Sequence, residues 1–274
     1  MENWTGILRL DAEVRNGKTV ARNVYFQGAY KVMRPIYHDE SGQACYYILN
    51  PGGGYLDGDR YRIQLTLDKQ TKLTLTTQSA TKIYKTPKSL AYQETEIDLK
   101  EGSYLEYIPD PIIGYRDACY KQKTVIRMKK GAKLLFSDII TPGWSPDGDR
   151  FSYNMLQLIN EIYMENELVV YDHIKLSPAT QNMDALGYME GFSHLGSMIV
   201  IGEETDPELI DRLYQAIHKD TKEFKVGLSL LPTAGFTLRV LANSTQTIER
   251  IFAECHSIIS REWFNITPSF LRKY

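Results

Sequence analysis

Short runs of alternating hydrophobic and polar residues, separated by Gly, Pro, Asn and Asp, make up most of this chain. Alternation with a period of two predicts half-buried strands, because successive strand side chains point to opposite faces of a sheet. Regular turns between such runs are typical of an all-β sandwich, barrel or solenoid. The predicted strands span residues 7–14, 19–26, 30–36, 44–49, 61–67, 72–77, 81–84, 90–99, 104–107, 123–128, 133–141, 151–161, 167–176, 197–201, 226–231 and 236–242.

Two stretches near the end of the chain have a helical pattern instead. Asp206, Pro207 and Glu208 form a helix start signal, with a capping side chain, an early proline and an acidic first turn. A second helix is predicted to begin at residues 243–245 and to run to about Phe264. Each carries an apolar stripe that can cover one face of a sheet. We find no linker or repeat, so the sequence predicts a single, mostly β domain over residues 1–274 with two helices in its C-terminal half.

Three aspartates share a strand face with hydrophobic neighbours. Asp59 has the parity of the apolar residues of segment 61–67, and Asp138 that of segment 134–140. Asp172 shares its side with Leu168 and with residues 170, 174 and 176. A carboxylate removed from water needs a partner, hydrogen bonds or a wet cavity, so the pattern predicts an internal polar space. The alternative is that each aspartate caps backbone amides near a strand end or turn, an objection that applies most to Asp59 and least to Asp172.

Composition narrows the function classes. The net charge is −2 at pH 7, so there is no basic field to attract nucleic acid or an anionic membrane. The N-terminus lacks signal-peptide features, and no apolar run is long enough to cross a bilayer. The three cysteines lie far apart without a CxxC motif, which favours reduced thiols and a cytoplasmic location.

The motifs for tight metal binding, phosphate binding and nucleophilic catalysis are missing. The five histidines form no HxH or HExxH pair, and the Asp-Gly-Asp sequences at 57–59 and 147–149 do not continue as calcium loops. The glycines at 52–54 are not followed by Gly-Lys-Ser/Thr, and there is no GxSxG. These absences predict no tightly bound metal or phosphate cofactor and give no support to nucleophilic catalysis. One enzymatic alternative is a β-solenoid carbohydrate hydrolase that uses Asp59 and Asp138 as paired carboxylates.

Two other features allow both a structural and a functional interpretation. Lys82 is either a surface lysine at a strand edge or a cation that balances an inward aspartate. Segment 107–118 is rich in Pro, Ile and Tyr, and is predicted to be an exposed loop whose apolar side chains pack on something. It either folds back onto its own sheet or contacts a partner through Ile108, Pro109, Asp110, Pro111 and Tyr115.

Four segments, in order along the chain, carry a resemblance to a known family. They are residues 50–60 ending in Gly58-Asp59, residues 78–84 (QSATKIY), residues 108–111 (IPDP) with 116–118 (RDA), and residues 138–143 (DIITPG). Together they resemble the urease accessory protein UreD family, called UreH in some species, over essentially the whole chain. The chain departs from the family pattern at Asp172-His173, where the family commonly has Glu, and in residues 144–149.

The resemblance implies a non-catalytic scaffold of helically wound, sandwich-like sheets, with two helices covering one face. Such a scaffold binds UreF, reaches the GTPase UreG through UreF, and docks on apo-urease. It implies an internal passage in which nickel(II) is in transit and not held tightly. The positions that match the family's functional residues are Asp59, Lys82, Asp138 and Asp172. A plain interaction module with no passage is a further alternative.

Overall fold

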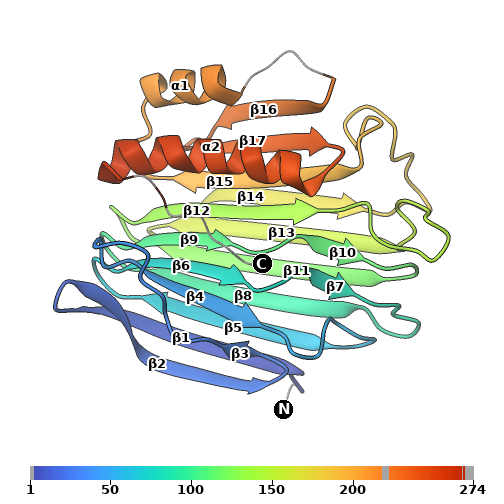
Figure 1. Ribbon diagram of the computed structural model, residues 1–274, viewed down its shortest axis with the longest axis horizontal. Coiled ribbons are helices and arrows are strands. Elements are labelled where there is room, and N and C mark those ends of the chain that lie inside the picture. The colour runs from blue at the N-terminus through green and yellow to red at the C-terminus, as the bar shows by residue number, and fades with distance from the viewer. Residues whose placement is uncertain (1–2, 218–221, 267, 269–274) are drawn as a thin grey trace.

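The strands form two sheets that face each other, as Figure 1 shows for the computed structural model, which describes residues 3–217, 222–266 and 268. Sheet A contains, in spatial order, β14 (Glu167–Leu176), β13 (Met155–Met164), β11 (Cys119–Met128), β8 (Ala91–Leu99), β5 (Arg60–Leu67), β1 (Gly6–Arg15) and β2 (Lys18–Gly28). Sheet B contains β16 (Phe224–Leu230), β17 (Gly235–Ala242), β15 (His194–Ile201), β12 (Lys133–Ile140), β9 (Tyr104–Ile108), β6 (Lys72–Thr77), β4 (Ala44–Leu49) and β3 (Lys31–Val32). The short strands β7 (Thr81–Ile83) and β10 (Ile112–Gly114) pair with each other, and β10 also pairs with β12.

The middle of the molecule is a helically wound stack of coils. The chain passes from sheet A to sheet B and back, so β1, β5, β8, β11 and β13 pair in parallel in sheet A. The strands β4, β6, β9 and β12 do the same in sheet B. Antiparallel pairs close both ends of the stack, for example β1 with β2 and β13 with β14. Since parallel neighbours stay in register, equivalent residues of successive coils lie directly above one another.

The hydrophobic core fills the space between the two sheets. In β5 and β8 every second residue is buried, so that one face of each strand points into the molecule. The main cluster of buried side chains draws on both sheets, including Leu65, Ile97 and Ile126 from sheet A and Leu75 and Phe136 from sheet B. The alternating pattern of the sequence therefore places polar residues on the outer face of sheet A and apolar residues inside.

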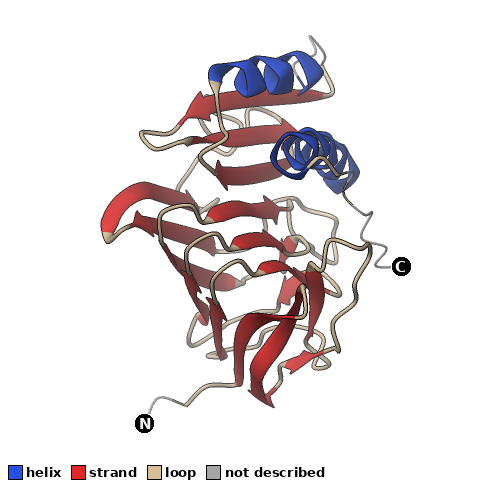
Figure 2. Cartoon of the chain, turned by 90° about the vertical axis from the view of Figure 1, so that its left-hand side faces the viewer, coloured by secondary structure: helices blue, strands red, loops and turns tan. Residues whose placement is uncertain are grey.

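Two helices cover the outer face of sheet B near its C-terminal strands, as Figure 2 shows from the side. They are α1 (Pro207–Ile217) and α2 (Thr245–Phe264). The Asp206 carboxylate accepts the Leu209 amide at the start of α1, and the Ser244 hydroxyl accepts the Thr247 amide at the start of α2. Both predicted helix starts are confirmed, and so is the prediction of a mostly β, sandwich-like fold with two late helices. The single-domain prediction for residues 1–274 stays a prediction.

Several details of the predicted strands were wrong. The predicted strand over residues 30–36 is reduced to β3, with an isolated bridge between Ile36 and Cys45, and β10 was not predicted at all. In β14 a bulge opposite Ile162 shifts the register. Because a bulge adds one residue to one strand, it reverses the parity on its far side. Leu168 consequently does not share the inward face of Asp172, and it is 51% exposed.

Candidate functional site

The four segments that carry the family resemblance occupy the same corner of successive coils. Each follows a strand of sheet B and leads the chain back towards sheet A: residues 50–60 after β4, 78–84 after β6, 108–118 after β9, and 138–143 at the end of β12. Backbone bonds join them, from the Tyr55 amide to Lys82, the Thr81 amide to Pro111, and the Thr141 amide to Ile112. Segments distant in sequence are thereby stacked into one wall.

One glycine in this wall is required by close packing. A Cβ atom added at Gly54 would lie 2.7 Å from the carbonyl oxygen of Lys82 and 2.7 Å from the Tyr84 ring. Distances this short exclude any larger side chain unless the backbone moves. The glycine-rich sequence therefore serves the contact between two corners, and gives no support to a phosphate cradle.

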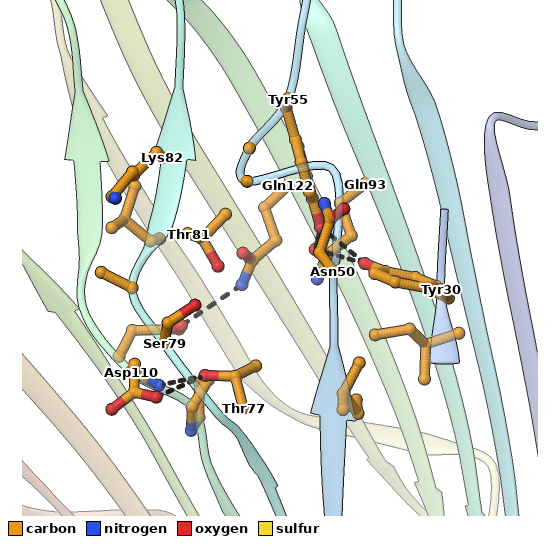
Figure 3. A pocket seen from close by; sticks show the side chains of 18 of the residues that line it. Tyr30, Asn50, Tyr55, Thr77, Ser79, Thr81, Lys82, Gln93, Asp110 and Gln122 are labelled. Atoms are coloured by element: carbon orange, nitrogen blue, oxygen red, sulfur yellow. Dashed lines mark hydrogen bonds between the residues drawn. The ribbon is translucent and has the colours of Figure 1, made fainter. Parts of the chain in front are cut away.

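A cavity of about 40 Å³ lies behind this wall, and Figure 3 shows the side chains that line it. All four corner segments contribute to its lining, which includes Asn50, Lys82, Asp110 and Asp138. A water molecule needs roughly 10–15 Å³ of such space, so the cavity is large enough for a few waters. That volume is too small for a sugar, and the geometry therefore gives no support to a carbohydrate hydrolase.

Polar side chains continue from this cavity into the space between the sheets, and we call this group the polar layer. In sheet A the layer follows the strand register, because Thr95, Thr124, Asn160 and Asp172 are paired neighbours on β8, β11, β13 and β14. In sheet B it follows the pairing of Asp138 on β12 with Ser197 on β15, and of Ser197 with Arg239 on β17. The complete polar layer comprises Gln93, Thr95, Gln122, Thr124, Asn160 and Asp172 from sheet A, and Asp138, Ser197 and Arg239 from sheet B.

Asp138 is the most deeply buried carboxylate of the polar layer, with 3% of its surface exposed. Burial is the main influence on its pKa and raises it to about 7, and the neighbouring Asp172 adds to this effect. The amides of Gln122 and Asn160 and the charge of Arg239 lower the pKa of Asp138, but they do not outweigh burial. The Gln122 amide donates to Oδ1 of Asp138 over 3.3 Å.

Three buried oxygens of the polar layer have no hydrogen-bond partner among the described residues: Oδ2 of Asp138, Oδ1 of Asn160 and Oγ1 of Thr124. Buried polar atoms are rarely left unpaired, and a polar cavity is where ordered water or an ion satisfies them. The predicted parity of Asp138 with Leu134, Phe136 and Ile140 is confirmed, since all three are buried in the main core.

Asp172 lies at the other end of the polar layer and is paired with a cation. The Arg239 guanidinium donates to Oδ1 of Asp172 and also to the Ser197 hydroxyl. The Asn160 amide donates to Oδ2 of Asp172 over 3.4 Å. The side chain of Asp172 is 14% exposed and that of Arg239 is 35% exposed, so the layer meets solvent here.

Asp59 and Lys82 belong to two of the corner segments, and they differ in their relation to the cavity. Asp59 precedes β5 and is half-buried; it accepts hydrogen bonds from the Leu56 amide (2.7 Å), the Thr5 hydroxyl (3.0 Å) and the Tyr61 hydroxyl (3.3 Å). These contacts match the capping interpretation, and Asp59 is not among the residues that line the cavity. Lys82 is half-buried and lines the cavity directly.

Segment 107–118 is not an exposed loop, and the alternative that it folds back onto its own sheet is confirmed. Asp110 and Pro111 are buried, while Ile108, Pro109 and Tyr115 are half-buried. The Thr77 hydroxyl donates to Asp110 over 3.0 Å and accepts the Asp110 amide over 2.7 Å. The segment forms β10 and inserts between β7 and β12, because a Pro- and Ile-rich stretch buries its apolar surface against its own sheet.

Sequence reasoning missed the uncharged members of the polar layer and its arginine. Gln93, Gln122 and Asn160 each share a strand face with buried hydrophobic residues, so the parity rule that selected the aspartates also applies to amides. Tyr30 and Tyr55 were also missed; their hydroxyls lie 2.5 Å apart, and both donate to Gln93. Arg239 had no local signal, because its partner Asp172 is distant in the sequence.

No group of three or more His, Cys, Asp or Glu side chains within the described residues is placed to hold a metal ion. Neither α1 nor α2 is long and apolar enough to cross a membrane, and these are the helices of the described part of the chain.

Comparison with known proteins places the chain in a family. A family model described as UreD urease accessory protein matches residues 5–273. The chain belongs to the UreD family. A relative named urease accessory protein UreD from Lachnoclostridium phytofermentans is 52% identical over 274 residues, which is 100% of both chains. A protein of the same name from Staphylococcus aureus strain RF122 is 43% identical over 275 residues, which is 100% of this chain and 99% of the relative. Membership of the UreD family makes the chain an accessory protein of urease maturation.

Proposed function

We propose that this UreD-family chain is a non-catalytic, cytoplasmic scaffold for nickel insertion into urease. In this proposal it binds UreF, reaches the GTPase UreG through UreF, and docks on apo-urease, and it interacts with neither nucleic acid nor membrane. GTP hydrolysis belongs to the partner, since the sequence of this chain contains no P-loop. Among the five candidate contact residues of segment 107–118, three are half-buried and therefore accessible to a partner: Ile108, Pro109 and Tyr115.

The second part of the proposal is that nickel(II) passes through the polar layer. One observation carries it: all four segments that resemble the family converge on one cavity, and this cavity reaches the buried Asp138. A metal in transit needs ligands that bind weakly and exchange readily, and carboxylate and amide oxygens hold nickel less tightly than imidazole or thiolate. Passage also requires that entry be favourable while exit stays easy. Asp59, Lys82, Asp138 and Asp172 are the residues that we assign to this passage.

Co-expression of the whole urease gene set with variants of this chain tests the passage. We expect Asp138→Asn to fold and to co-purify with its partners as the wild type does, but to lower the nickel content and activity of urease several-fold. Asp184→Asn is the matched control, because Asp184 is an exposed aspartate outside the polar layer. Full nickel loading of urease by the Asp138→Asn variant would exclude the transit role.

Two further measurements test the scaffold role. Mass spectrometry of the proteins that co-purify with the tagged chain should identify UreF, UreG and urease, and their absence would contradict the assignment of partners. Calorimetry of the isolated chain should give weak nickel binding, since the described residues contain no group of three or more His, Cys, Asp or Glu side chains placed to hold a metal ion. Submicromolar, stoichiometric binding would show a tight site instead.

A further inference from the structure

One cation faces two carboxylates at the β14 end of the polar layer. Arg239 is bound directly to Asp172, and both side chains are close enough to Asp138 to alter its ionisation. The three groups come from both sheets: Asp138 from β12, Asp172 from β14 and Arg239 from β17. This arrangement leaves Asp138 with an unpaired buried oxygen, whereas Oδ1 of Asp172 is occupied by the guanidinium and Oδ2 accepts from Asn160.

The charges of this trio determine how strongly the layer attracts a divalent cation. When both carboxylates are ionised, the trio with its one guanidinium carries a net charge of −1, whereas the two carboxylates alone would carry −2. In a site shielded from water, a pair of carboxylates beside the unpaired amide oxygen of Asn160 has the character of a binding site, not of a passage. A guanidinium stays protonated in a protein, so the charge of Arg239 is permanent.

We propose that Arg239 is the charge-setting residue of the polar layer: it occupies Asp172, so that an incoming divalent cation meets Asp138 as the one free carboxylate and is not retained. This inference rests on the proposed passage of nickel. Asp172 in this view is a positioning residue that holds the arginine, and it does not itself ligate the metal. The bond from Arg239 to the Ser197 hydroxyl fixes the guanidinium from the second side.

A charge cycle tests this role, with urease nickel content and the nickel retained on the co-purified accessory protein as readouts. Asp172→Asn leaves the cation of Arg239 unpaired beside Asp138, so we expect urease nickel to fall several-fold. The double variant Asp172→Asn/Arg239→Gln removes both charges, so we expect urease nickel to return close to the wild-type value. Such a rescue is specific to a counter-ion, because a lost ligand is not restored by a second substitution.

Two single variants at Arg239 complete the cycle. Arg239→Gln frees Asp172 beside Asp138, so we expect the accessory protein to retain nickel and urease to lose it. Arg239→Lys keeps the charge and is expected to load urease nearly as the wild type does. Soluble yield and circular dichroism of each variant monitor folding. If Arg239→Gln does not fold, the comparison of Asp172→Asn with the double variant decides, since neither of these leaves a carboxylate at position 172 without its cation.

The possible failures are distinguishable. A double variant as defective as Asp172→Asn would overturn the inference and assign Asp172 as a carrier ligand. The inference would also be overturned if the Arg239→Gln variant loaded urease with the normal amount of nickel and retained none itself. If Asp138→Asn lowers urease nickel in the same experiment, the passage stands although the role of Arg239 fails. If Asp138→Asn loads urease fully, the passage itself is wrong.

Discussion

The buried ion pair between Glu106 and His256 gives a stability prediction that the structure makes quantitative. Nε2 of His256, on α2, lies 2.8 Å from Oε1 of Glu106, on β9. Glu106 also accepts hydrogen bonds from the Thr74 hydroxyl (2.6 Å) and the Tyr104 hydroxyl (2.9 Å). The exposed fractions of the two side chains are 15% for His256 and 8% for Glu106. The pair thus ties the second helix to sheet B, away from the polar layer, and its removal should weaken the fold.

The size of the contribution to stability follows from the pKa shift of Glu106. Burial alone would raise the pKa of Glu106, but the charge of His256 and the hydrogen bonds from His256, Thr74 and Tyr104 outweigh burial and lower it to about 2. Relative to the ordinary value near 4.5, this shift corresponds to about 3 kcal/mol, at 1.36 kcal/mol per pH unit. For His256, burial lowers the pKa, and Glu106 more than compensates, so that the pKa is raised above 6.5.

The pH dependence has opposite signs for the two partners. The pKa of Glu106 is lowered by folding, so its contribution is present above about pH 4.5 and is lost as the pH falls towards 2. The pKa of His256 is raised by folding, so its contribution is present below pH 6.5 and is lost as the pH rises through the raised value. The pair should therefore stabilise the fold most between about pH 4.5 and 6.5.

Urea unfolding of the full-length chain, followed by tryptophan fluorescence across this pH range, measures the effect. We expect His256→Gln to reduce the free energy of unfolding by about 3 kcal/mol at pH 6, because one partner is left buried and unpaired. Lys69→Ala is the control, since Lys69 and Glu101 form a pair with exposed fractions of 69% and 66%. An exposed pair of this kind should contribute less than about 1 kcal/mol.

A small cavity beside this pair is lined by His38, Asp39 and Cys45, among others. His38→Gln is a second control, because it removes a nearby imidazole and leaves the ion pair intact. The ion pair would not be the source of this stability if His256→Gln had the free energy of unfolding of the wild type and lost as much of it as the pH rises. The reasoning would fail equally if His38→Gln reproduced the whole change.

Five further substitutions test the corner, the bulge and the helix cap, with thermal or urea unfolding as the measurement for each. Gly54→Ala places a Cβ atom 2.7 Å from a backbone carbonyl oxygen, and we expect a loss of about 1–3 kcal/mol; unchanged stability would mean that the corners are not tightly packed. Leu158→Ala should cost about 2–5 kcal/mol and Leu168→Ala less than about 0.5 kcal/mol, since their exposed fractions are 0% and 51%; equal costs would contradict the bulge. Ser244→Ala should cost about 1 kcal/mol by removing the bond to the Thr247 amide, whereas Ser244→Thr should keep it.

The sequence by itself determined the element types and the direction of most side chains. Alternation defined the strands β4, β6 and β14 at their observed bounds, and capping residues defined the starts of both helices. Parity alone placed Asp138 inside the core, because the period of a strand is a local property of the backbone. It failed at Leu168, where one extra residue in the strand reverses the parity without changing the composition.

Tertiary structure decided which of these residues meet. Asp59 precedes a strand and is held by two local hydrogen bonds, from Leu56 and Tyr61, and by one from the distant Thr5, so its capping role depends on the folded turn and not on its parity. The apolar segment around Asp110 had two equally local interpretations, and only the packing of β10 between β7 and β12 distinguished them. The pairing of Arg239 with Asp172 joins two sheets through residues far apart in the chain. Contacts of this kind arise from the stacking of whole coils, and no local pattern in the sequence records which coil faces which.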